Sequence, residues 1–226
     1  MNLRIRRSGA GLALLLLVSC FATRPAAAQG DWRGAFWVWD NPDAASGKGE
    51  SEPLLLRYAF ELPAPPVAAQ LAVAADDRAE FFVNGQGVGS HGSHSTPKTI
   101  DVLRELKAGK NVLALMAKND GGPAGVIARL DITLPDKKKL VVGTTRKWRS
   151  FTGTAEKWNA ADFDDSQWRT AVVLGPASMG PWSLAGAAKI NTYLPASEEV
   201  HHFVLPEGFK IELVASEPTI INPVCI

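Results

Sequence analysis

The sequence predicts an all-β protein whose main body is a two-layered sandwich. Three observations lead to this expectation: apolar and polar residues alternate with a period of two over several segments, turn-forming residues separate these segments, and almost no stretch has helical periodicity. Alternation with a period of two is typical of strands that bury one face. Many short strands without intervening helices form sandwiches or barrels.

Two segments show the alternation most clearly, and in each the apolar side chains fall on one face. The first face comprises Leu54, Leu56, Tyr58, Phe60 and Leu62, and the second comprises Val126, Ala128, Leu130, Ile132 and Leu134. Residues 112–117 form a continuous apolar run instead, which predicts a central strand covered on both faces. Only residues 102–108 are expected to form a short helical turn.

Turn residues predict how the strands connect. Asn84-Gly85 lies between two strand-like segments, and both residue types accept the positive φ angles of a tight type I′ hairpin. Residues 119–123, Asn-Asp-Gly-Gly-Pro, are expected to form a similar hairpin turn between the 112–117 run and the next stripe. The basic run at residues 137–139 is expected to be a solvated turn.

The first 29 residues are typical of an export signal. Three arginines precede an apolar run at residues 9–18, which is too short to span a bilayer, and Ala26-Ala27-Ala28 then provides small residues for cleavage. Cleavage there gives a periplasmic or extracellular protein. In the alternative, residues 17–20 form a lipobox, and a lipid on Cys20 anchors the exported protein to a membrane.

The remaining boundaries follow from composition. The sandwich is predicted over residues 30–190, and residues 191–204 are predicted to form a linker. Residues 209–214 alternate like one more strand, but no partner strand follows them. A lone strand leaves its backbone groups unpaired, so residues 205–226 are expected to be the truncated start of another domain. The alternative is that this strand joins the edge of the sandwich.

Charge and motifs exclude several classes of function. The formal net charge is +1, so the chain lacks the concentrated basic face that nucleic acids require. It also lacks a haem-attachment motif, zinc-ligand spacing, a phosphate-binding loop and a nucleophile elbow. The paired carboxylates lie at turn-like positions rather than around a cleft, as a glycosidase would require. We therefore expect no enzyme and no cofactor, with calcium as the one exception considered below.

Several short segments, in a fixed order, resemble the galactose-binding-like accessory domain of exported bacterial rhamnosidases and β-galactosidases. They include Trp37-Val38-Trp39, Ala74-Ala75-Asp76-Asp77, Phe82-Val83-Asn84-Gly85, residues 106–114, residues 163–168 and Gly180-Pro181-Trp182. The resemblance implies a jelly-roll sandwich that serves as a non-catalytic module, with a glycan as its partner. It also implies that the Asp-Asp and Val-Asn-Gly elements are largely structural.

Residues 205–218 resemble a different family, the planctomycete-type membrane-bound dehydrogenases, at the start of their β-propeller. In that family a sandwich can precede the propeller, and a c-type haem domain can follow it. The resemblance implies a downstream propeller domain as a partner. It leaves open an alternative in which this chain is the N-terminal fragment of an exported haem-containing oxidoreductase.

Seven residues are candidates for ligand binding at the rim of the sandwich: Asp76, Asp77, Asn84, Asn119, Asp120, Trp158 and Trp182. Carboxylates at a strand end can accept hydrogen bonds from sugar hydroxyls or bind Ca²⁺, although they can equally cap a turn. Each tryptophan of the sandwich is expected mainly to pack in the core or at its edges. Trp158 and Trp182 lie in Asn-rich and Gly/Pro-rich stretches, so these two are the better candidates for exposure as platforms for a sugar ring.

Two histidines, His91 and His94, lie in a Ser/Gly-rich stretch with no third metal ligand nearby, so we expect a solvated loop and no metal site. Altogether the sequence predicts an exported accessory module that binds carbohydrate or packs against a neighbouring domain. A purely structural sandwich without a ligand is the remaining alternative.

Overall fold

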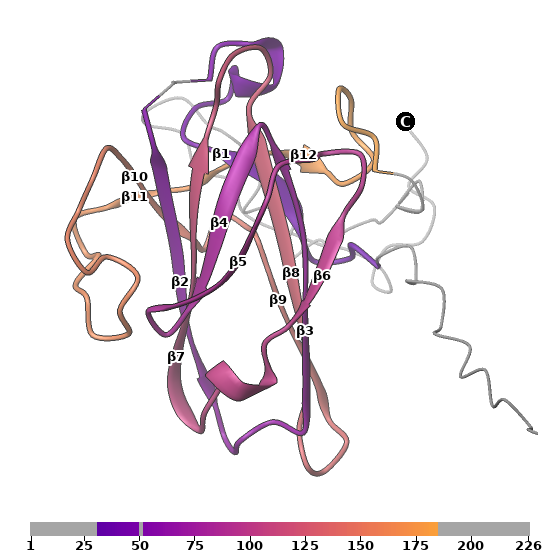
Figure 1. Ribbon diagram of the computed structural model, residues 1–226, viewed down its shortest axis with the longest axis vertical. Coiled ribbons are helices and arrows are strands. Elements are labelled where there is room, and N and C mark those ends of the chain that lie inside the picture. Colours follow the sequence, from indigo (N-terminus) through magenta and orange to yellow (C-terminus); the bar gives the residue numbers. More distant parts are fainter. Residues whose placement is uncertain (1–30, 50–51, 185–226) are drawn as a thin grey trace, which may run out of the picture.

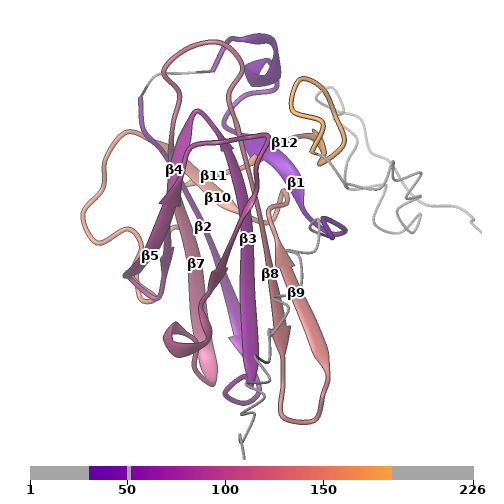
Figure 2. The same ribbon diagram turned by 45° about the vertical axis from the view of Figure 1, so that its right-hand side comes forward.

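A computed structural model describes residues 31–49 and 52–184, which form two stacked antiparallel sheets (Figure 1). The first sheet contains, in spatial order, β12 (Val172–Pro176), β1 (Phe36–Trp39), β8 (Gly125–Thr133), β3 (Ala68–Asp76) and β6 (Lys98–Asp101), with β9 (Lys139–Gly143) also paired to β8. The second sheet contains β11 (Arg169–Thr170), β10 (Arg149–Thr152), β2 (Leu54–Leu62), β7 (Gly109–Lys118), β4 (Arg78–Val83) and β5 (Gln86–His91). Figure 2 shows the two sheets as separate layers.

The predicted all-β sandwich is confirmed. The only helices in the described residues are two 3-10 turns, η1 (Ala44–Ser46) and η2 (Leu103–Glu105), and η2 falls inside the helical turn expected over residues 102–108. None of the helices in this part of the chain has the length and apolar character needed to cross a bilayer. The signal segment, the linker and the strand at residues 209–214 lie outside the described residues, so those expectations stay predictions.

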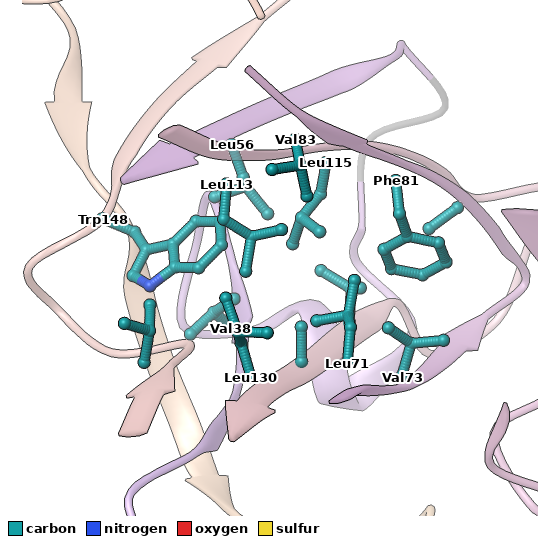
Figure 3. Close-up of a cluster of buried hydrophobic side chains, with 14 of the residues drawn as sticks. Val38, Leu56, Leu71, Val73, Phe81, Val83, Leu113, Leu115, Leu130 and Trp148 are labelled. Carbon is teal, nitrogen blue, oxygen red and sulfur yellow. The ribbon is translucent and has the colours of Figure 1, made fainter. Parts of the chain in front are cut away.

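The core lies between the sheets and is built by the two apolar stripes. Leu56, Leu113 and Leu115 from the second sheet face Val38, Leu71 and Leu130 from the first sheet (Figure 3). On β2, Leu54, Leu56 and Leu62 are buried, while Tyr58 and Phe60 pack partly buried against the same core. Every apolar residue predicted for the β8 stripe is also buried there. The predicted inward faces of both strands are therefore confirmed.

Strand β7 is covered on both faces, as its continuous apolar run predicts. Leu113 and Leu115 point into the core between the sheets, whereas Val112 and Ala114 belong to a second buried cluster on the outer face. That outer cluster includes Trp158 and Trp168, which come from residues 153–168, the connection between β10 and β11. We call this connection the excursion; it stands out to one side of the second sheet in Figure 1.

One predicted hairpin is confirmed and the other is wrong. Asn84 and Gly85 have φ angles of 51° and 85° and join β4 to β5, as a type I′ turn requires. Residues 119–124, however, join β7 of the second sheet to β8 of the first sheet, so they cross between layers and close no hairpin. The Gly-rich, Pro-containing composition allows both kinds of bend, and sequence alone does not tell which strands pair. Lys137 and Lys138 of the basic run lie in the turn between β8 and β9, where Lys137 has a φ of 66°, whereas Lys139 begins β9.

The core provides a direct test of the fold. Leu113→Ala is expected to lower the free energy of unfolding by about 2–5 kcal/mol, because it removes buried methyl groups and leaves a cavity between the sheets. Urea unfolding followed by circular dichroism measures the change. Val67→Ala, at an exposed position, is the matched control and should change stability by less than about 0.5 kcal/mol. Equal effects of the two variants would contradict this packing.

Candidate functional site

Two connections between the sheets lie side by side at one end of the sandwich. Strand β3 ends at Asp76 and leads through Asp77 into β4, while residues 119–124 lead from β7 into β8. The register explains why they meet, because Asp76 pairs with Gly125 in the first sheet and Arg78 pairs with Lys118 in the second. This end is the upper one in Figure 1. The predicted rim residues Asp76, Asp77, Asn119 and Asp120 are therefore brought together.

The polar side chains at this end mostly bind each other. Asp77 Oδ2 accepts a hydrogen bond of 2.6 Å from the backbone N–H of Asp120, and Arg78 pairs with Asp120 Oδ1 at 2.9 Å. Asn119 is buried and donates from its amide to the carbonyls of Gly49 and Gly122. These contacts join the two crossings to each other, which is the structural role considered for such carboxylates.

Trp182 also reaches this end, where it is packed as expected of the sandwich tryptophans and is not an exposed platform for a sugar. Its side chain is 4% exposed and stacks on Trp37 with ring centroids 4.4 Å apart. The indole Nε1 donates a 2.7 Å hydrogen bond to Asp76 Oδ2. The Gly/Pro-rich segment that suggested a solvated loop instead packs over the outer face of the first sheet, where Trp182 and Ile127 share a buried cluster.

Trp158 is likewise buried, at 9% exposure, so it also packs against a sheet and is not an exposed platform for a sugar. It packs edge-on against Phe82, 5.5 Å between ring centroids, on the outer face of the second sheet. Asn84 lies at the far end of β4 from the rim. Its side chain accepts from the backbone N–H of Val112 and donates to Asn111 Oδ1 and Glu105 O, so it supports the hairpin.

Arg57 holds the excursion against the second sheet. This side chain is 1% exposed, and its guanidinium donates to the carbonyls of Phe163 and Ala160 and forms a 2.6 Å ion pair with Asp165. The neighbouring Asp164 caps the turn by accepting a hydrogen bond from the backbone N–H of Ser166. This hydrogen bond lowers the pKa of the Asp164 carboxyl. Both aspartates therefore act in the structure of the excursion, Asp164 through this cap and Asp165 through its ion pair with Arg57.

Calcium was considered for the carboxylates at the rim, and the residues there do not fit it well. Ca²⁺ takes six to eight oxygen ligands. Here the carboxylates of Asp76, Asp77 and Asp120 accept from indole, amide and guanidinium donors. Within residues 31–49 and 52–184, no three His, Cys, Asp or Glu side chains form a group that could hold a metal ion. Calcium binding stays a prediction, and no step below depends on it.

The outer face of the second sheet carries an open groove of about 510 Å³ beside this rim. It lies over the ends of β4, β5 and β7 and is lined by Pro53, Arg78, Glu80, Ser90, His91, Met116 and Lys118. The cross-strand register assembles it. Met116 pairs with Glu80, Glu80 pairs with Ser90, and Arg78 pairs with Lys118. Residues directly opposite each other share a face, so these side chains form two adjacent rows.

The groove combines an apolar floor with several hydrogen-bonding groups. Partly buried Met116 and Pro53 supply the apolar surface, while exposed Arg78, Lys118 and Glu80 supply donors and an acceptor. Such a mixture suits a ligand that presents both hydroxyl groups and C–H surface, and the volume lies in the range of small-ligand sites.

The two histidines of the predicted solvated loop have different positions. His91 ends β5 and lines the groove, with Nε2 2.7 Å from Thr96 O. Because a carbonyl oxygen only accepts, Nε2 carries the hydrogen. His94 lies next to the rim, with Nδ1 3.6 Å from Asp76 Oδ1. The loop expected to include both residues is therefore shorter than predicted, since the strand extends through His91.

Sequence reasoning missed the groove residues. Arg78 and Glu80 alternate with the buried Ala79 and Phe81, so each strand alone indicates only a solvated outer face. Lys118 follows the apolar run of β7 and has the same simple interpretation. Only the pairing of β4 with β7 brings the three charges together. One sequence signal for the groove was present, because Met116 is an apolar residue on the outer face beside these charges. It indicates a binding groove only once the register of β4 and β7 is known.

Comparison with known proteins finds that this chain is similar to α-L-rhamnosidases and to a lectin. No protein-family model matches the chain. It is 29% identical over 182 residues to an α-L-rhamnosidase of Streptomyces avermitilis, a match that covers 76% of this chain and 17% of the relative. The crystal structure of Streptomyces avermitilis α-L-rhamnosidase complexed with L-rhamnose has a TM-score of 0.63 and 30% identity over 68% of this chain and 16% of that chain.

A second kind of relative is a lectin. The crystal structure of the Pleurotus ostreatus lectin in complex with GalNAc has a TM-score of 0.64 and 29% identity over 70% of this chain and 47% of the lectin. The chain thus spans less than half the length of each of these relatives. The likenesses support the predicted galactose-binding-like sandwich. The propeller part of the predicted resemblance lies outside the described residues and stays a prediction.

The anchor of the excursion gives a testable expectation. Arg57→Ala should destabilise the protein by about 3–5 kcal/mol, because it leaves the Asp165 carboxylate and two carbonyls without their donor. Hydrogen exchange at residues 153–168 should accelerate more than exchange in β3 or β8. Arg57→Lys should recover only part of the loss, since an ammonium cannot reproduce the forked contacts.

Arg104→Ala, at an exposed position in η2, is the control and should leave both stability and exchange nearly unchanged. Uniform acceleration of exchange across both sheets in Arg57→Ala would show that Arg57 stabilises the whole fold rather than anchoring the excursion.

Proposed function

We propose that this chain is a non-catalytic carbohydrate-binding module whose ligand lies in the groove over β4, β5 and β7. The observation that carries the proposal is the groove itself, in which Arg78, Glu80 and Lys118 surround the apolar Met116. Sugars present hydroxyl groups at their edges and C–H groups on their faces, so they match this combination. Similarity to a lectin solved with GalNAc and to a rhamnosidase solved with L-rhamnose supports the same class of ligand.

The carboxylates support a binding rather than a hydrolytic role. Glycoside hydrolysis ordinarily uses two carboxyl groups that flank the scissile bond. Among the described residues that line the groove, Glu80 is the one acidic side chain. Asp120, at the neighbouring rim, is already paired with Arg78. The groove can therefore accept and donate hydrogen bonds to a sugar without the second group that hydrolysis would need.

The module would act beside other domains of an exported protein. The relatives are much longer than the matched region, and residues 1–29 have the features of an export signal. We propose that the sandwich directs a larger exported protein to a glycan, in the periplasm or outside the cell. A structural role without a ligand is the competing proposal, favoured by the engagement of the rim side chains with each other.

The decisive experiment measures sugar binding by the full chain. Isothermal titration with L-rhamnose, with GalNAc and with sugars chosen from a glycan array is expected to give saturable binding. Lys118→Ala should weaken it about 3- to 10-fold, because it removes a charged hydrogen-bond donor at an exposed site. Lys110→Ala is the matched control, since Lys110 is also exposed on β7 but lies at the opposite end of that strand.

Each result has a defined meaning. Silence across a diverse glycan array would favour the structural role and overturn the proposal. Equal losses of sugar affinity in Lys118→Ala and Lys110→Ala would show that the ligand does not bind in the groove. The titration should be repeated in EDTA and with added Ca²⁺. The groove side chains can make the contacts themselves, so sugar binding should persist in EDTA. If binding required calcium, the ligand would have to be assigned to the rim at Asp76 and Asp77 instead of the groove.

A further inference from the structure

Phe151 is an exposed aromatic side chain on the same outer face as the groove. It is 39% exposed and stacks on Trp168, with ring centroids 5.3 Å apart and planes inclined by 23°. Trp168 is itself buried and packs edge-on against Phe163 at 5.4 Å. One face of the Phe151 ring is therefore backed by a second ring, and part of the residue remains exposed to solvent.

The strand register puts Phe151 in line with the groove. Phe151 on β10 pairs with Leu55 on β2, Leu55 pairs with Met116, Met116 pairs with Glu80, and Glu80 pairs with Ser90. Neighbouring strands lie about 4.8 Å apart, so this row extends for roughly 19 Å from β10 to β5. Leu55, next to Phe151 in this row, is buried with the excursion tryptophans. Phe151 and Met116 thus lie on opposite sides of a covered apolar residue.

We propose that the outer face of the second sheet binds a glycan chain of several sugar units, with one end in the groove and a distal unit stacked on Phe151. The proposal rests on the function proposed above and adds a second subsite to it. The occupant is argued from chemistry. An aromatic face matches the C–H face of a sugar ring, the groove matches its hydroxyls, and the row that connects them is longer than one ring.

The test compares short and long sugars on the full chain. The probes are oligosaccharide series from monosaccharide to hexasaccharide, drawn from galactan, xylan, mannan and cellulose, together with free L-rhamnose and GalNAc. Affinity is expected to rise over the first few units and then level off. Phe151→Ala should lower the affinity for the longer oligosaccharides roughly 3- to 10-fold, the loss expected for one aromatic contact. It should leave the affinity for monosaccharides unchanged.

Two further variants separate stacking from folding. Phe151→Tyr keeps the ring and should keep the gain with length, whereas Phe151→Leu keeps apolar volume without a ring and should lose most of it. Val141→Ala, which changes an exposed apolar side chain on the first sheet, is the control and should bind every length like the unaltered protein. Thermal unfolding of each variant verifies that the excursion is still folded.

The outcomes distinguish this inference from the function on which it rests. No binding at any length overturns the proposed function. Binding that is equally tight for monosaccharide and hexasaccharide, or a gain with length that Phe151→Ala leaves intact, overturns only the second subsite. Sedimentation analysis tests the alternative that the exposed Phe151 side chain contacts a second copy of this chain. Self-association that disappears in Phe151→Ala would assign Phe151 to contact with a second copy and would also overturn the proposal.

Discussion

The outer face of the second sheet depends on one buried cation, Arg57. Its guanidinium projects from β2 and binds the excursion through Asp165 and two carbonyls, while the ring of Phe163 lies over it at 5.2 Å. A buried charge is costly unless nearly all its hydrogen-bonding capacity is used, and here only Nε lacks a partner among the described residues. The interaction therefore specifies where the excursion lies on the sheet more than it adds to the net free energy of folding.

The consequence of this anchor is a division of the face into closed and open parts. The excursion covers β7 at Ala114 and β4 at Phe82, where Trp158 and Trp168 complete a small core. Two residues further along the same strands, Met116 packs against the edge of that small core and, together with Glu80, lines the groove. Trp168 at the boundary also supports Phe151. The excursion that Arg57 anchors thus packs against Met116 at the edge of the groove and, through Trp168, supports the exposed aromatic ring.

Local patterns in the sequence predicted the strands well but predicted their partners poorly. A period of two requires only that one face be buried, so the inward residues of β2 and β8 follow from the sequence directly. The Asn84-Gly85 turn follows in the same way, because positive φ angles at two adjacent positions restrict the residue types. Residues 119–124 show the limit. Their composition permits a bend, but whether that bend stays in one sheet or crosses to the other depends on long-range pairing.

The same limit explains the tryptophans. Trp158 and Trp182 lie in segments rich in Asn, Gly and Pro, and such segments usually lie at the surface. Both segments fold back over a sheet, however, because each sheet has an outer face with apolar side chains that also need cover: Leu55 and Val112 in one case, Ile127 and Ala74 in the other. Local composition describes the backbone of a loop, whereas the burial of its side chains depends on what the neighbouring face presents.

A groove made by strands differs physically from one made by loops. Its side chains start from paired backbone, so the spacing of Arg78, Glu80 and Lys118 is set by the sheet before any ligand arrives. Binding then requires little ordering of the backbone, and less of the interaction energy is lost to conformational entropy.

The rim is preorganised differently, through hydrogen bonds and an ion pair among its own polar groups. Those bonds use up donors and acceptors that a ligand would need, whereas the side chains of Glu80 and Lys118 have no hydrogen-bond or ion-pair partner within the described part of the chain. This difference in free hydrogen-bonding capacity is the physical reason for assigning the ligand to the sheet rather than to the loops.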